Sequence, residues 1–135
     1  MLPSGLPESV ANEEDLARFL TSSGQFNTIM VRPAAYLPNP KDRETSVSRH
    51  GAEPIARLRE IGRIAAGDRK LYGVALCKAG EIRAAQLEVA SAEPPERHAV
   101  IRGWPWIESD PELQKAKQKE LAVMIASAAG QARLL

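Results

Sequence analysis

The stretch Leu71-Tyr72-Gly73-Val74-Ala75-Leu76-Cys77 carries the clearest strand signal in the chain, and the predicted fold is built around it. It is nearly all apolar, and a short run without polar alternation is typical of a strand that is buried on both faces. We therefore predict a strand over residues 71–77 at the centre of a sheet.

Weaker patterns predict the strands around it. Residues 45–49 alternate, so that Val47 is expected to point inward and Ser46 and Ser48 outward. Further strand candidates are residues 26–31, 86–90 and 99–101.

The first helix is expected over residues 12–20. Asn12 can cap it, acidic residues follow in the first turn, and an apolar stripe comes next. The stripe consists of Leu16, Phe19 and Leu20.

A second helix is expected over residues 52–66, with Pro54 in its first turn and Gly67 as its C-terminal stop. Its buried stripe would consist of Ile55, Leu58, Ile61 and Ala65. Residues 78–83 predict a single turn or a short helix.

The C-terminal helix, residues 109–130, has the strongest signal. Ser109 and Glu112 match a capping box, and Gly130 stands where a C-terminal cap belongs. Its predicted apolar face consists of Leu113, Leu121, Met124, Ile125 and Ala128.

Together these elements predict an α+β fold. We expect a small mixed or antiparallel sheet of three to five strands with about three helices, the long C-terminal helix packing on the sheet. The length of 135 residues favours a single domain over residues 1–135, preceded by a loose arm over residues 1–11.

Composition excludes several classes of function. The single cysteine, Cys77, rules out an internal disulfide and a multi-cysteine zinc site, and we expect it to be an inert buried thiol. There is no glycine-rich nucleotide loop and no membrane-spanning apolar run, and we expect no signal peptide. We therefore expect a cytoplasmic protein without cofactor or metal.

Residues 32–44 are expected to form a stiff, presented loop, because Pro33, Pro38 and Pro40 prevent regular strand pairing. In the motif Gly103-Trp104-Pro105-Trp106 two large aromatic side chains share a rigid turn. Exposed, they could anchor a partner protein or stack on a base; buried, they would fill the core beneath the last helix. The candidate partner-binding residues here are Tyr36, Arg43, Trp104 and Trp106.

Residues 45–51 suggest an anion site, because hydroxyls, a cation and an imidazole precede a helix start. The candidates are Ser46, Ser48, Arg49 and His50; a polar edge strand is the alternative. His98, the second histidine of the chain, either joins His50 in an acid–base pair or simply begins a strand.

Two family resemblances follow from these residues. Thr45-Ser46-Val47, the helix after it, the strand around Val74 and His98-Ala99-Val100-Ile101 resemble a group of small uncharacterised bacterial proteins. Those proteins carry a Leu-Ser-Val strand and a later His-Ala-x-Ile strand after a proline-rich segment. The resemblance covers residues 30–102 and implies a shared fold. Thr45 replaces the usual leucine, and the long C-terminal helix is a further departure.

The second resemblance is that of Val47-Ser48-Arg49-His50-Gly51 to the strand, His-Gly and helix opening of ADP-ribosyltransferases. In that family the histidine and glycine bind NAD. Ala52 stands where the family has threonine or serine, and no tyrosine or glutamate partner follows at the usual sites.

The preferred function at this point is a non-enzymatic interaction or regulatory protein of bacterial or phage origin, acting in a defence or counter-defence system. The alternative is a nucleotide- or nucleic-acid-binding protein or enzyme that uses Ser46, Arg49 and His50, with Arg43 and His98 in the same pocket. Nucleic acid could also bind the basic cluster Lys115, Lys117 and Lys119. The chain is expected to have no membrane partner.

Overall fold

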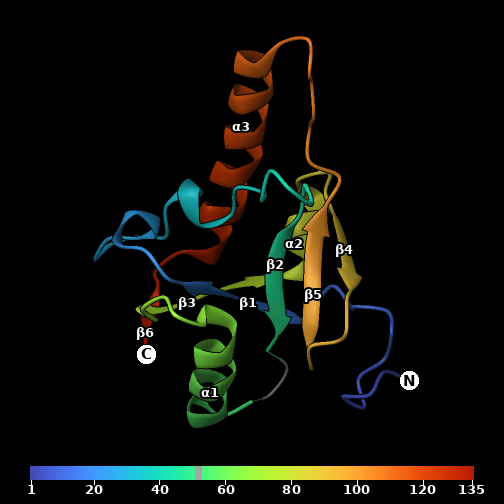
Figure 1. Cartoon of the computed structure of the whole chain (residues 1–135), viewed down its shortest axis with the longest axis vertical. Helices are drawn as coiled ribbons and strands as arrows, with labels where there is room; N and C mark the ends of the chain where they lie inside the picture. The colour runs from blue at the N-terminus through green and yellow to red at the C-terminus, as the bar shows by residue number, and fades with distance from the viewer. Residues whose placement is uncertain (51–52) are drawn as a thin grey trace.

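A computed structural model describes residues 1–50 and 53–135, and within these it shows the predicted α+β class. Six strands form one antiparallel sheet across the described residues, one more than the predicted range. Their spatial order is β4 (Glu88–Ser91), β5 (His98–Arg102), β2 (Thr45–Arg49), β1 (Asp15–Leu20), β3 (Gly73–Lys78) and β6 (Arg133–Leu134). In Figure 1, β2, β5 and β4 run across the direction of β1 and β3.

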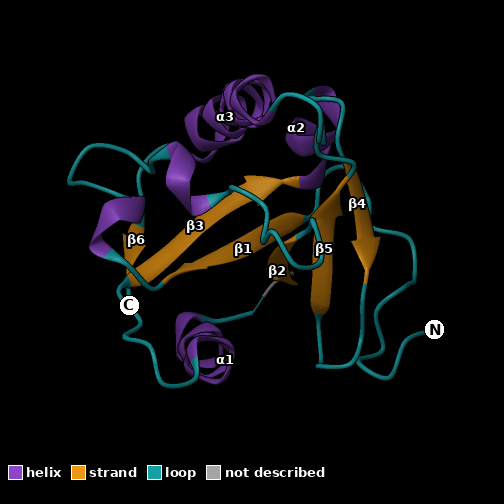
Figure 2. Cartoon of the chain, turned by 45° about the horizontal axis from the view of Figure 1, so that its top comes forward, coloured by secondary structure: helices purple, strands orange, loops and turns teal. Residues whose placement is uncertain are grey.

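Helices cover both faces of this sheet. Helix α1 (Ile55–Ala66) lies on one side, whereas α2 (Ala79–Ala84) and α3 (Pro111–Ala129) lie on the other (Figure 2). Two short 3-10 helices, η1 (Ser23–Gln25) and η2 (Pro33–Ala35), lie in the connection between β1 and β2. Gly51 and Ala52, where we expected the strand to break and α1 to begin, lie outside the described residues.

The helix predicted over residues 12–20 is wrong, because this segment forms strand β1. Leu16 and Leu20 enter the core beneath α2 and α3, and Ala17 and Phe19 face α1. Six residues of β1 pair in register with β3, from Asp15 with Lys78 to Leu20 with Gly73. Long-range pairing and burial on both faces therefore outweigh the local helix signal.

The strand predicted over residues 26–31 is reduced to one bridge between Phe26 and Val31. The Asn27 side chain explains the difference, since its Oδ1 accepts hydrogen bonds from the amides of Ile29 and Met30, each at 2.8 Å. An asparagine that bonds its own backbone in this way favours a turn over a ladder.

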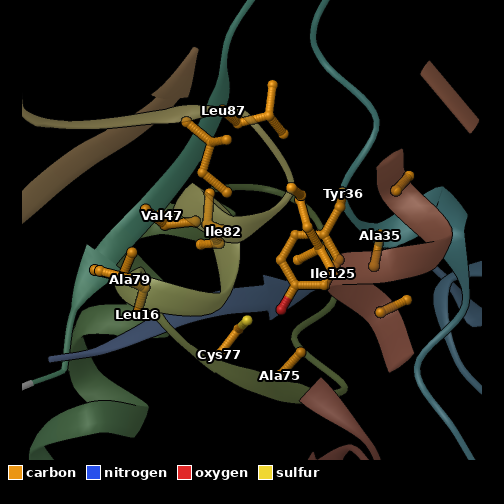
Figure 3. Packing of buried hydrophobic residues seen from close by; sticks show 14 of the residues in the cluster. Leu16, Ala35, Tyr36, Val47, Ala75, Cys77, Ala79, Ile82, Leu87 and Ile125 are labelled. Atoms are coloured by element: carbon orange, nitrogen blue, oxygen red, sulfur yellow. The ribbon is translucent and has the colours of Figure 1, made fainter. Parts of the chain in front are cut away.

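Two clusters of apolar side chains stabilise the fold. The larger one lies between the sheet and helices α2 and α3, and Figure 3 shows Leu16, Val47 and Ile82 within it. The smaller one joins Leu58 of α1 to Ala17, Phe19 and Val74. Because these three partners belong to β1 and β3, the adjoining face of β2 is not packed in this cluster.

The buried face of α1 differs from the predicted stripe. Leu58, Gly62 and Ala66 are buried, and Ile55 and Ala65 are exposed. Gly62 accounts for this rotation, because a Cβ there would lie only 2.8 Å from the Phe19 ring. The small residue lets the helix approach the sheet closely. Gly67 ends the helix as predicted, with φ of +60°.

Helix α3 also differs from the prediction at its start and on its buried face. The Asp110 side chain, and not Ser109, accepts from the amide of Leu113, with Pro111 in the first turn. Leu113 and Met124 are exposed. The buried residues are Gln118, Ala122, Ile125 and Ala126. Gly130 caps the C-terminus as predicted.

The N-terminal arm has no helix or strand, yet it is bonded to the sheet. Arg49 of β2 donates to the carbonyls of Pro7 and Ser9, and Arg83 donates to the carbonyl of Val10, whose side chain is buried. The residues expected to be loose therefore have specific attachments to the rest of the chain.

Candidate functional site

A groove of about 610 Å³ lies between α1, the end of β1, strand β2 and the loop before β2. It opens where β1 and β2 separate. These strands pair only at Leu16 with Arg49 and at Ala17 with Ser48, whereas β2 stays paired with β5 as far as Thr45. Helix α1 packs on β1 but not on β2, so the face of the split toward α1 stays accessible.

Arg18 of β1 lines the groove at the split. Its Nε donates to the carbonyl of Ala35 at 2.7 Å, and its Nη1 donates to the carbonyl of Ser46 at 2.9 Å. Burial lowers the pKa of Arg18 most, and nearby Arg69 lowers it further. The guanidinium nevertheless stays charged near neutral pH. No carboxylate pairs with it within residues 1–50 and 53–135.

Arg69 adds a second positive charge to the lining. Its Nε and Nη2 donate to the carbonyls of Ala66 and Ala65 at the end of α1, and its Nη1 lies 3.5 Å from Thr21 Oγ1. It, too, has no carboxylate partner in the part of the chain that the structure describes. Two unpaired guanidinium groups that repel each other favour a bound anion.

The acidic residues of the lining are engaged elsewhere or belong to the loop. Glu96 pairs with Arg57 at 2.9 Å, and Arg57 also pairs with Glu60. Asp42 accepts from the amide of Glu44, in the loop that precedes β2. With Glu96 held by Arg57, Arg18 of β1 and Arg69, which follows α1, are the lining cations without a carboxylate partner among the described residues, and Asp42 and Glu44 are carboxylates of the loop.

An apolar wall faces these charges. It contains Phe19 of β1, Leu37 of the proline-rich loop, and Ile61 and Ile64 of α1. Ile64 is 75% exposed. Such a combination of apolar surface with a few polar groups is typical of small-molecule sites.

His98 lines the groove next to the two serines of β2. Its register partner is Ser48. Because the amide of Arg49 donates to the carbonyl of Arg97, the neighbouring Ser48–His98 pair is of the non-hydrogen-bonded type, in which side chains approach most closely. The Nδ1 atom of His98 lies 3.0 Å from the Ala92 carbonyl oxygen.

That contact defines the tautomer of His98. A carbonyl oxygen can only accept, so Nδ1 must carry the hydrogen and donate. In the neutral ring, Nε2 is then left as a hydrogen-bond acceptor. The groove therefore offers hydrogen-bond donors from the guanidinium groups of Arg18 and Arg69 and an acceptor from His98. The hydroxyls of Ser46 and Ser48 also belong to the lining.

The structure separates the residues predicted around His50. Ser46, Ser48 and His98 line the groove, whereas Arg49 points to the opposite face of the sheet and is buried. Arg49 donates to both carboxylate oxygens of Glu14, at 2.6 and 2.9 Å. Its donors serve the fold, so the predicted anion cluster is not assembled as one group.

His50 is not among the described residues that line the groove. Its Nδ1 is buried without a hydrogen-bond partner in the described part of the chain. Burial is the largest influence on this ring and lowers its pKa below 6.5. Asp15 and Glu53 act against that shift, whereas Arg133 and Arg97 add to it.

The lowered pKa of His50 predicts a pH-dependent stability. The unfolded chain takes up a proton near pH 6.5, before the folded protein does, so the free energy of unfolding should decrease as pH falls through 6.5 and level off below the folded pKa. In His50→Gln this part of the decrease should be absent. Urea unfolding of both proteins at pH 8, 6.5 and 5 measures it; identical pH dependence in the two proteins would contradict the prediction.

The predicted partner-binding residues divide into buried and accessible ones. Tyr36 and Trp104 are buried in the larger core cluster. Trp104 therefore fills the core beneath the helices, and the Tyr36 side chain is not accessible to a partner protein. In Figure 3 the Tyr36 hydroxyl points toward Cys77. Burial raises the pKa of the Tyr36 hydroxyl and raises that of the buried Cys77 thiol to about 12.

Arg43 and Trp106 lie at the surface. The Arg43 guanidinium lies 4.6 Å from the centre of the Trp106 ring and pairs with Glu108 at 3.1 Å. These contacts join the proline-rich loop to the segment before α3. Trp106 is half-buried and Trp104 is buried, so Trp106 is the more accessible of the two tryptophans.

Sequence reasoning missed Arg18, Phe19 and Ile61 as site residues. The helix prediction for residues 12–20 hid the first two, because it placed Phe19 on a buried stripe and assigned no role to Arg18. The available signal was a single cation within the otherwise apolar run Leu16-Ala17-Arg18-Phe19-Leu20. In a strand, such a residue has to find polar partners.

Comparisons with known proteins were negative. No protein-family model, curated protein or solved structure matches the chain. The described residues contain no group of three or more histidine, cysteine, aspartate or glutamate side chains suited to a metal ion. No helix in the described ranges is long and apolar enough to cross a membrane.

Proposed function

We propose that this protein binds a small organic anion in the groove between α1 and β2. The observation that carries the proposal is Arg18, a partly buried guanidinium that donates to two backbone carbonyls and has no carboxylate partner among the described residues. A charge removed from water is costly unless an opposite charge compensates it. An anion at Arg18, shared with Arg69, would supply that compensation.

The rest of the lining supports an organic ligand. The volume of about 610 Å³ lies in the range of small-molecule sites. Leu37, Ile61 and Ile64 provide apolar surface for a ligand body, and Ser46 and His98 provide polar contacts. The proposed ligand is therefore a phosphate or carboxylate attached to a partly apolar group.

Loss of either arginine should weaken this binding. We expect Arg18→Gln to reduce affinity at least tenfold, because a charge-assisted hydrogen bond is worth about 1.5–3 kcal/mol. Arg69 is more exposed, so Arg69→Gln should cost about three- to tenfold. Isothermal titration calorimetry with inorganic phosphate, pyrophosphate, benzoate and nucleoside monophosphates, at low and high salt, measures both effects.

Arg63→Gln is the matched control. Arg63 is exposed on α1, the helix that forms one wall of the groove, and does not line the groove, yet its replacement removes the same charge. Its affinity should stay within about twofold of the wild type. Because Arg18 also bonds the backbone, circular dichroism must show that Arg18→Gln is folded. Absence of binding for every anion in the panel, or equal losses in Arg63→Gln and Arg69→Gln, would reject the proposal.

A second candidate is a protein–protein contact, as favoured from the sequence. It is supported by the turn after η1, where Ile29 and Met30 are exposed although Asn27 holds their amides. Large apolar side chains on a rigid turn bind with a small ordering cost. The accessible Trp106, with Arg43 over its ring, belongs to the same proposal. Neither Ile29, Met30 nor Trp106 lines the groove, so this function does not compete with anion binding.

A further inference from the structure

We infer that the anion is a ribonucleoside monophosphate and that His98 recognises its ribose. This inference rests on the proposed anion-binding function and specifies the ligand class. Three parts of the groove carry it: the unpaired Arg18 and Arg69, the acceptor Nε2 of His98, and the apolar wall of Ile61 and Ile64.

The first two parts are arranged along strand β2. Arg18 donates to the carbonyl of Ser46, which places the guanidinium beside that residue. Two residues further on, Ser48 pairs with His98. Two residues of a strand span about 6.6 Å. This separation is comparable to that between the 5′-phosphate and the 2′- and 3′-hydroxyls of one nucleotide.

His98 determines what the ligand must offer at its position. Because Nδ1 donates to the Ala92 carbonyl, neutral His98 can only accept at Nε2. A ligand group that meets it must therefore be a donor, and a second carboxylate or phosphate there would have no hydrogen to give. Ribose hydroxyls are neutral donors at that distance from the phosphate.

The third part is suited to the base. Ile61 and Ile64 belong to α1, and Arg69 donates to the carbonyls at the end of that helix. Ile64 is 75% exposed, and with Ile61 it offers apolar surface against which the face of any of the four bases can pack. Phosphate, ribose and base thus have separate counterparts in the groove, and inorganic phosphate or a simple carboxylate would use only part of them.

The experiment compares the four ribonucleoside 5′-monophosphates with their 2′,3′-dideoxy counterparts by calorimetry. In the wild type at least one ribonucleotide should bind about tenfold more tightly than its dideoxy form, since each lost hydrogen bond to a ribose hydroxyl costs about that much. In His98→Leu the two forms should bind about equally. Arg69→Gln should weaken both forms by the same factor, and His50→Gln should keep the tenfold ratio.

A second measurement does not depend on any variant. Nitrogen-15 NMR of the wild-type imidazoles should show His98 with the hydrogen on Nδ1. Addition of the ribonucleotide should shift the His98 Nε2 resonance, and addition of the dideoxy form should leave it nearly unchanged.

The outcomes distinguish a failure of the ribonucleotide inference from a failure of the anion-binding proposal. Equal affinity for ribo and dideoxy forms in the wild type, an unchanged ratio in His98→Leu, or a hydrogen on Nε2 overturns the ribonucleotide inference alone. So does binding of benzoate or pyrophosphate without binding of any nucleotide. If none of these anions binds, the proposed function fails as well.

Discussion

Replacing Arg49 with alanine is expected to lower the free energy of unfolding by about 3–5 kcal/mol. The Arg49 side chain is 1% exposed, and that of its partner Glu14 is 14% exposed. Removing the guanidinium would leave the Glu14 carboxylate without its ion pair. The carbonyl of Pro7 and the hydroxyl of Ser91 would lose a donor as well.

Urea denaturation of wild type and variant measures this effect. Arg102→Ala is the matched control, because Arg102 pairs with Glu88 on the same sheet but the two side chains are 52% and 68% exposed. An exposed pair of this kind contributes about 0–1 kcal/mol. Arg49→Lys should recover part of the loss, since it keeps the charge but not the planar fork. A loss in Arg49→Ala no larger than that in Arg102→Ala would contradict the prediction.

The second large effect is expected for Leu58→Ala, which should cost about 2–5 kcal/mol. Leu58 is fully buried and joins α1 to Ala17, Phe19 and Val74. Few buried side chains form the smaller cluster, so few neighbours can shift into the cavity that the shorter alanine side chain would leave. Thermal and urea unfolding measure the loss.

Ile64→Ala is the control for Leu58. Ile64 lies on the same helix and is 75% exposed, so its truncation should change stability by about 0.5 kcal/mol or less. Because α1 forms one wall of the groove, Leu58→Ala should also weaken anion binding although Leu58 is not a lining residue. Equal stability of the two variants would show that α1 does not depend on this contact.

Several elements could be predicted because their signals are local. The strands of residues 45–49 and 73–78 follow from alternation and from a continuous apolar run, and Gly67 and Gly130 mark the ends of α1 and α3. The buried faces of the helices could not be predicted equally well. For α1, the close approach at Gly62 to the Phe19 ring rotates the helix, and Phe19 is remote in the sequence.

The candidate site was predicted in part. Ser46 and Ser48 were recognised from the alternation of β2, and His98 from its place at the start of β5. Arg49 was grouped with them, but alternation places its side chain on the other face, where Glu14 binds it. Arg18 was missed because its role depends on β1 being a strand.

The class of the fold, the positions of α2 and α3 and most strands follow from the amino-acid sequence, because short-range periodicity and capping residues specify these locally. Tertiary structure alone decided that residues 15–20 become β1 and that β1 separates from β2 after Ala17. It also decided that Arg18, Arg69 and His98 line one groove. These outcomes depend on strand pairing and burial between segments far apart in the chain, and such contacts outweigh the local preference of any one segment.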